Sequence, residues 1–90
     1  MAEQIDHLEK QVQDGQAAEL LLQSSTFTAT MQAAAERIVA EWSREKDPAQ
    51  REILWAEQRG LLRVTKGLRK LQSDGKVAAE ALRVDEVPEA

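Results

Sequence analysis

The sequence predicts an all-α protein built around an antiparallel helical hairpin, with helices over about 26–44 and 48–73. Apolar residues recur at spacings of three and four through both segments, as expected for amphipathic helices. Capping residues bound these segments, and the two prolines stand only at positions 48 and 88. An N-terminal helix and a short C-terminal helix are expected on either side. We expect oligomerisation to complete a bundle, since 90 residues build only a modest core.

The stretch from Asp47 to Gly75 carries the clearest start and stop signals. Asp47 is a good N-cap, because its carboxylate accepts hydrogen bonds from the free N–H groups of the first turn. Pro48 suits the first helical position, and Gln50 stands where a capping box places a side chain that reaches back. Gly75 suits the left-handed conformation that ends many helices. The sequence therefore predicts a helix that ends before Gly75 and a separate short helix over 76–83.

One face of this long helix is apolar. Leu54, Leu61 and Leu68 repeat every seven residues, with Val64 and Leu71 between them, as in a short coiled-coil seam. The predicted helix-packing interface consists of this seam, Trp55 on its flank, and Trp42 and Ile38 of the preceding helix. Its residues are Leu54, Leu61, Val64, Leu68, Leu71, Trp42, Trp55 and Ile38.

Two glycines lie along the edge of the seam. Gly60 and Gly67 are seven residues apart, and each costs up to about 1 kcal/mol of helix stability relative to Ala. We interpret them as places where the backbone of another helix comes close. Trp42 and Trp55 flank the connection between the two helices, where we expect them to pack together.

The opposite face of the long helix is basic, with Arg59, Arg63, Lys66 and Lys70 spaced four, three and four apart. From Arg59 to Lys76 six basic residues stand against one Asp, which gives this segment a charge of +5. Since the net charge of the chain is −4, the remaining residues together carry −9. The stripe is either a solvated face or a docking site for an acidic helix or a phosphate backbone. The acidic remainder makes nucleic acid the less favoured partner.

The chain before this hairpin reads as an amphipathic helical segment over 1–23, in which Ile5, Leu8 and Val12 need a partner helix. Gly15 is expected to break it, and a continuous helix over 3–23 is the alternative. The run of hydroxyl residues at 24–26 is expected to cap the second helix. The predicted domains are the segment 1–23, a hairpin domain over 24–83 and a flexible acidic tail over 84–90.

No residue pattern points to chemistry. The chain has no Cys and a single histidine, His7. The acidic residues Asp6 and Glu9 near it do not share its helix face, so the three do not form a metal site. The hydroxyl run has no flanking histidine or nucleophile-elbow glycines, and no phosphate-binding loop is present. We therefore predict that the protein is not an enzyme and has no cofactor or metal site. No apolar run reaches the length of a membrane span, so we expect no membrane partner and a cytoplasmic location in a bacterial host, with virion association as a second setting.

Several stretches together resemble a group of small helical proteins encoded among phage virion structural genes: LLLQSSTF, QREILWAEQRGLLRVTKGLRKL and SDGKVAAEAL. The resemblance covers about residues 20–82. It implies a non-enzymatic accessory role in the virion or in head assembly, exerted through helix–helix packing with further copies or a larger virion protein. It carries over no functional residue. The alternative is a small regulatory binder, a protein inhibitor or a nucleic-acid-associated protein, that uses the basic stripe.

Overall fold

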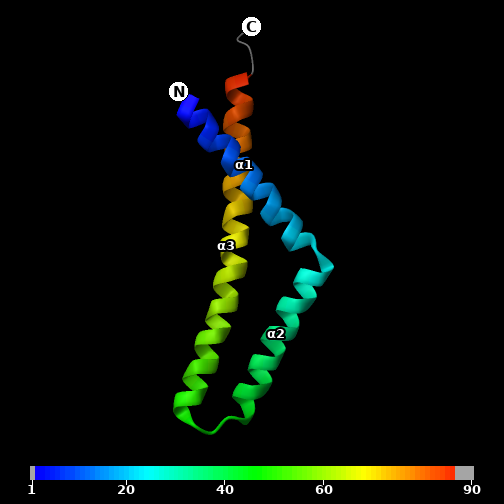
Figure 1. Cartoon of the computed structure of the whole chain (residues 1–90), viewed down its shortest axis with the longest axis vertical. Coiled ribbons are helices and arrows are strands. Elements are labelled where there is room, and N and C mark those ends of the chain that lie inside the picture. Colours follow the sequence, from blue (N-terminus) through cyan, green and yellow to red (C-terminus); the bar gives the residue numbers. More distant parts are fainter. Residues whose placement is uncertain (1, 87–90) are drawn as a thin grey trace. The chain divides into compact units, whose positions relative to one another are not determined.

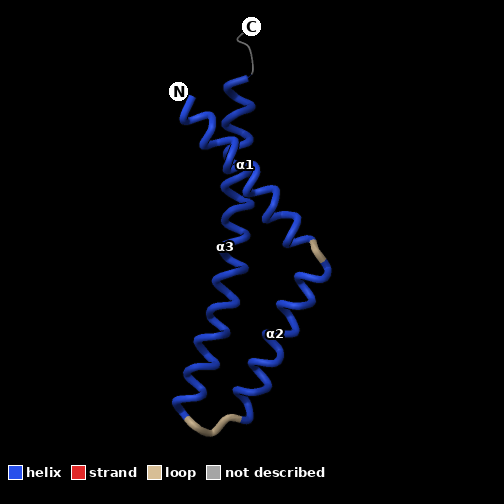
Figure 2. Tube along the Cα trace, viewed as in Figure 1, coloured by secondary structure: helices blue, strands red, loops and turns tan. Residues whose placement is uncertain are grey.

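The computed structural model describes residues 2–86, and within them the chain is entirely α-helical apart from two short loops (Figures 1 and 2). Three helices occupy this range: α1 (Ala2–Gln23), α2 (Ser25–Arg44) and α3 (Pro48–Glu86), with no strand among the described residues. The predicted all-α class is confirmed. None of the helices over 2–86 is both long enough and apolar enough to cross a bilayer.

The chain divides into two compact units. The first unit combines the chain up to Leu22 with the chain from Gly67 onward, and the second unit is Gln23–Lys66. The second half of α3 therefore groups with α1, whereas the sequence placed it in a hairpin domain over 24–83. Each unit has a small apolar core, with Ala18 and Ala78 buried in the first and Ile38 and Leu54 in the second.

Helix α2 begins where the hydroxyl run predicts. Ser24 has extended backbone angles, and its Oγ accepts a hydrogen bond from the Phe27 N–H at 3.2 Å. The hydroxyl of Thr28 donates back to the Ser24 carbonyl at 2.7 Å. Ser24 is thus a side-chain N-cap that satisfies one of the free N–H groups of the first turn.

The start of α3 also follows its sequence signals. Asp47 Oδ1 accepts a hydrogen bond from the Ala49 N–H at 3.2 Å, and the Asp47 carbonyl accepts one from the Arg51 N–H at 3.0 Å. Pro48 is the first helical residue, where its missing N–H leaves no hydrogen bond unmade. The Asp47 cap and the start at Pro48 are confirmed, but the capping box is not, because the Asp47 N–H donates to Glu45 Oε1 at 3.1 Å and not to Gln50.

The predicted end of the long helix at Gly75 is wrong. Helix α3 runs through Gly75 to Glu86, and no glycine among the described residues has a positive φ. The segment 76–86 contains three Ala, two Glu and one each of Leu, Arg and Lys, and no Gly or Pro, so its helix propensity favours continuing the helix once the stop at Gly75 is not used. The expected short C-terminal helix is therefore the last part of α3. Residues 84–86 of the expected tail are helical, and 87–90 lie outside the described residues.

The expected break at Gly15 is also wrong, and the alternative of a continuous helix is the correct one. Helix α1 extends from Ala2 to Gln23 through Gly15 without interruption. Gly15 and Gly75 are both buried in the first unit. Neither glycine acts as a helix breaker, and their role in packing follows from the contacts described below.

Candidate interaction surfaces

Within the second unit, the side of α3 that is least exposed contains polar as well as apolar residues. Leu54 is buried, and Gln58, Leu61 and Thr65 are half-buried, at spacings of four, three and four. Val64, which the sequence placed in the seam, is 49% exposed. The predicted seam lies within a fraction of a turn of the side that packs inward. It differs from that side because the prediction followed the apolar side chains alone and treated the polar positions as gaps.

The two polar residues of this stripe differ in how they are satisfied. The Thr65 hydroxyl donates to the Leu61 carbonyl of its own helix at 3.3 Å. Gln58 Oε1 is buried and accepts no hydrogen bond from any described residue. A buried acceptor without a partner costs about 1–3 kcal/mol. Sequence reasoning missed Gln58, and its signal was its position four residues after Leu54 on the apolar stripe.

Next to Gln58 lies an apolar groove between α2 and α3, within the second unit. Its volume is about 230 Å³, and we call it the tryptophan groove; its lining residues are Ile38, Val39, Trp42, Leu54, Trp55 and Gln58. Trp42 is 40% exposed and Trp55 is 57% exposed. The predicted pair of tryptophans therefore lines one groove, and both residues remain partly exposed to solvent.

Arg51 holds Trp42 in place at the end of the groove. Its guanidinium carbon lies 3.8 Å from the centroid of the Trp42 ring, within cation–π distance. The same guanidinium donates to the Glu45 carbonyl at 3.1 Å through Nη1, which satisfies a carbonyl just beyond the end of α2. Arg51 thus links the α2–α3 loop to the indole and fixes one wall of the groove.

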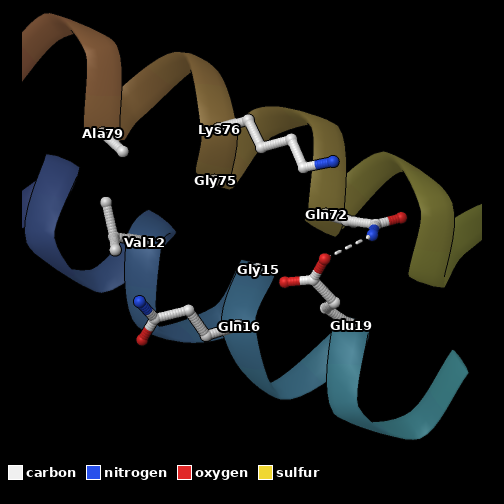
Figure 3. A pocket seen from close by; sticks show the side chains of 8 residues that line it. All are labelled: Val12, Gly15, Gln16, Glu19, Gln72, Gly75, Lys76 and Ala79. Atoms are coloured by element: carbon white, nitrogen blue, oxygen red, sulfur yellow. Dashed lines mark hydrogen bonds between the residues drawn. The ribbon is translucent and has the colours of Figure 1, made fainter. Parts of the chain in front are cut away.

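In the first unit, α1 and α3 approach each other through two glycines (Figure 3). A Cβ added at Gly15 would lie 2.8 Å from Gly75 Cα and 2.8 Å from the Leu71 carbonyl oxygen. A Cβ at Gly75 would lie 2.9 Å from Gly15 Cα and 2.9 Å from the Gln11 carbonyl oxygen. These distances are shorter than side chains tolerate, so the crossing requires glycine on both helices.

Within the single chain, the close approach lies at other glycines than Gly60 and Gly67, and an approach to these two by a helix of another copy stays a prediction. A Cβ at Gly60 or Gly67 would have no described atom of a neighbouring segment within 4 Å. Gly15 and Gly75 carry the contact instead, and each lies three residues before a buried alanine, Ala18 and Ala78. The small pair Gly-x-x-Ala on both helices was the available signal, and it was missed because both glycines read as helix breakers.

A shallow hollow of about 160 Å³ lies beside this crossing, in the first unit. Figure 3 shows its side chains, among which Gln72 Nε2 donates to Glu19 Oε1 at 3.2 Å. The other residues that line it are Val12, Gly15, Gln16, Gly75, Lys76 and Ala79. No group of three or more His, Asp or Glu residues within the described range is placed to hold a metal ion. We interpret the Glu19–Gln72 bond as a polar contact that links the two helices.

The remaining predicted seam residues also belong to the first unit. Leu68 is half-buried and Leu71 is 42% exposed. Leu68 follows the same inward stripe as Leu61, whereas Leu71 lies on its flank as Val64 does. The use of Val64 and Leu71 in packing therefore stays a prediction about an assembly, since the single chain leaves both open.

The basic stripe is exposed along its whole length. Arg59, Arg63, Lys66 and Lys70 are all exposed, and Lys70 Nζ pairs with Asp74 Oδ2 at 2.7 Å. An exposed pair of this kind at positions i and i+4 contributes little to stability. The geometry is that of a solvated helix face, and the use of this stripe to dock a partner stays a prediction.

Comparison of the chain with protein-family models, with curated proteins and with solved structures gives no match. The surfaces described above are therefore the basis for any statement about function.

Proposed function

We propose that this protein is a non-enzymatic interaction protein that assembles through helix packing, in the first place with further copies of itself. The exposed apolar side chains carry this proposal. Four apolar residues are buried among the described positions, and two of them are alanines. Against these stand twelve exposed large apolar residues, including Trp55 at 57% and Leu62 at 52%. A chain in which both tryptophans stay partly exposed leaves apolar surface that a partner can bury.

Exposed apolar side chains occur in both units. Leu20 and Val77 of the first unit are 70% and 68% exposed, and Val39 and Ile53 of the second unit are 53% and 51% exposed. Assembly with other helices is the means by which such a chain gains a full core.

In this proposal α2 and the first half of α3 form the antiparallel hairpin that the sequence predicts, and oligomerisation completes a helical bundle. The setting that the resemblance suggests is a phage particle, where the protein would serve as a virion or head-assembly accessory protein. The basic stripe would remain at the outside of the bundle, because it lies opposite the packing side of α3.

The test is the molar mass in solution across a concentration series, by multi-angle light scattering at low and at moderate salt. We expect a dimer or larger species at both salts, because apolar burial is little affected by the screening that weakens surface charge pairs. A chain that stays a helical monomer at every concentration up to about 1 mM would refute self-assembly. Its dissociation constant would then lie above about 1 mM, which corresponds to an association free energy weaker than about −4 kcal/mol.

A further inference from the structure

One sequence pattern stands on both helices of the crossing in the first unit. Each of six residues of α1 has the same residue type 60 positions later in α3: Leu8, Lys10, Asp14, Gly15, Ala18 and Leu22. The leucines of the pattern are half-buried and its glycines and alanines are buried, on both helices. Its lysine and aspartate form an ion pair on each helix, at 3.0 Å in α1 and at 2.7 Å in α3. The two helices therefore present the same kind of surface to each other.

The backbone contacts at the crossing are reciprocal. A Cβ added at Gly15 would lie 2.8 Å from Gly75 Cα and 2.8 Å from the Leu71 carbonyl oxygen, and a Cβ at Gly75 would lie 2.9 Å from Gly15 Cα and 2.9 Å from the Gln11 carbonyl oxygen. Each added Cβ thus meets the other glycine and the carbonyl four residues before that glycine. Such reciprocity defines a two-fold contact between two copies of one surface. The backbones of α1 and α3 therefore cross about a local two-fold axis between the two glycines.

The hollow beside the crossing follows the same two-fold relation. Its lining residues form pairs at the same offset of 60, in which Val12 corresponds to Gln72 and Glu19 to Ala79. The axis therefore relates the contact of Glu19 with Gln72 to the contact of Val12 with Ala79. Figure 3 shows the first pair at one end of the hollow, joined by the 3.2 Å hydrogen bond, and the second pair at the other end. The two-fold relation holds for the backbone and is broken by these side chains.

The side chains that break the symmetry distinguish between possible partner helices. With α1 as the partner of α3, a polar pair meets at one end of the hollow and an apolar pair at the other. A second α3 would instead place Gln72 beside Ala79 at both ends and bring two Lys76 side chains to the hollow, where like charges repel. Two α1 helices would place the half-buried Glu19 carboxylate beside Val12 at both ends. A carboxylate that loses its hydrogen-bond donor in such a place is destabilising.

We propose that Glu19 and Gln72, together with Val12 and Ala79, select α1 as the partner of α3 at a crossing whose backbone equally accepts two copies of either helix. The surface of α3 around Gly75 fits a helix of the α1 pattern, which carries an apolar residue and a carboxylate seven positions apart on either side of a glycine. The inference goes beyond the proposed function and does not rest on it. A further copy of the chain can use this surface of α3 only by supplying its own α1.

The test moves the hydrogen bond to the other end of the hollow in the full chain. A one-sided exchange on α3 combines Gln72→Val with Ala79→Glu, and a one-sided exchange on α1 combines Val12→Gln with Glu19→Ala. Each one-sided variant lacks one member of the amide–carboxylate pair. The full exchange of all four residues restores the pair at the opposite end of the hollow. It also keeps the composition of the chain, so the summed helix propensity is unchanged.

The measurement is the melting temperature by circular dichroism at 222 nm, at one fixed chain concentration. A hydrogen bond to a charged group is strong enough to shift the melting temperature of a domain of this size by about 4 °C or more. The shifts of the two one-sided variants should therefore add up to a fall of at least about 8 °C, since their differences in helix propensity cancel in the sum. The full exchange should melt less than about 4 °C from the unaltered chain.

Gln13 and Ser73 provide a matched control. They are related by the same offset, but both are exposed and neither lines the hollow. The shifts of Gln13→Ser and Ser73→Gln should simply add in the double variant, as they do for independent sites.

The recovery in the full exchange decides the inference. Recovery supports it, also where a one-sided variant fails to fold, because separate packing roles at the four positions would not be restored by moving the pair. A full exchange that does not fold, or whose shift equals the sum of the two one-sided shifts, overturns it. One-sided shifts that add up to a fall of less than about 4 °C overturn it as well. A chain that stays monomeric in light scattering overturns the proposed function and leaves this inference standing.

Discussion

The two buried glycines provide a quantitative test of the crossing between α1 and α3, because the chain contains its own controls. All four glycines lie inside helices, so replacement by alanine gains about 1 kcal/mol of helix propensity at each. Gly67 is open, with no described neighbour within 4 Å of an added Cβ, whereas a Cβ at Gly75 would lie 2.9 Å from Gln11 O and Gly15 Cα. The nearest atoms at Gly75 are backbone atoms, which move only if the helices separate.

Overpacking of this kind costs about 1–3 kcal/mol. Gly67→Ala should therefore stabilise the chain by about 1 kcal/mol. Gly75→Ala gains the same helix propensity but is also destabilised by the overpacking. The difference between the two variants isolates the steric effect, about 1–3 kcal/mol. For a domain of this size each kcal/mol shifts the melting temperature by about 4–8 °C, so Gly75→Ala should melt at least about 4 °C below Gly67→Ala.

The assay is thermal unfolding followed by circular dichroism at 222 nm, at one fixed chain concentration because assembly makes the midpoint depend on concentration. Gly15→Ala should behave as Gly75→Ala does, since its Cβ would lie 2.8 Å from Gly75 Cα. The double variant should cost less than the sum of the two single variants, because both act on one contact. A Gly75→Ala melting temperature equal to or above that of Gly67→Ala would refute the close crossing.

Two further changes test other features of the structure. Ser24→Ala removes the side-chain acceptor of the Phe27 N–H and should lower stability by about 1 kcal/mol in urea unfolding; an unchanged midpoint would show that Ser24 does not cap α2. Reversing charge at Arg59, Arg63 and Lys66 together should leave the molar mass and helicity unchanged, because all three are exposed. Loss of the assembly on this reversal would contradict a purely solvated face, and salt-dependent DNA binding that the reversal abolishes would support the alternative binder.

The contrast between the glycines shows why sequence patterns reached only part of the packing. Helix starts at Ser24 and Asp47 were predictable, because a cap acts through hydrogen bonds within one turn of the chain. The expected stops at Gly15 and Gly75 were wrong, because these glycines have the same local preference whether they stop a helix or allow one to cross another. What distinguishes the two roles is the presence of a second helix, and that information is not local.

The inward face of α3 shows the same limit. The repeat of Leu54, Leu61 and Leu68 was sufficient to place the packing side within a fraction of a turn. Periodicity alone could not tell that Gln58 and Thr65 join that side while Val64 stays 49% exposed. Which residues of α3 face inward depends on where the neighbouring helix lies and on which polar groups of α3 keep a hydrogen-bond partner there.

The sequence by itself determined the helical class, the capped starts of α2 and α3 and the two-faced character of α3, since capping and periodicity are properties of short stretches. Only the tertiary structure decided that α1 and α3 run through their glycines and that Gly15 meets Gly75. It also decided that Gln58 Oε1 is buried and accepts no hydrogen bond from the described residues, beside two partly exposed tryptophans. These features arise from contacts between residues as far apart in the chain as 15 and 75. Their energies depend on distances of a few ångströms that no local pattern encodes.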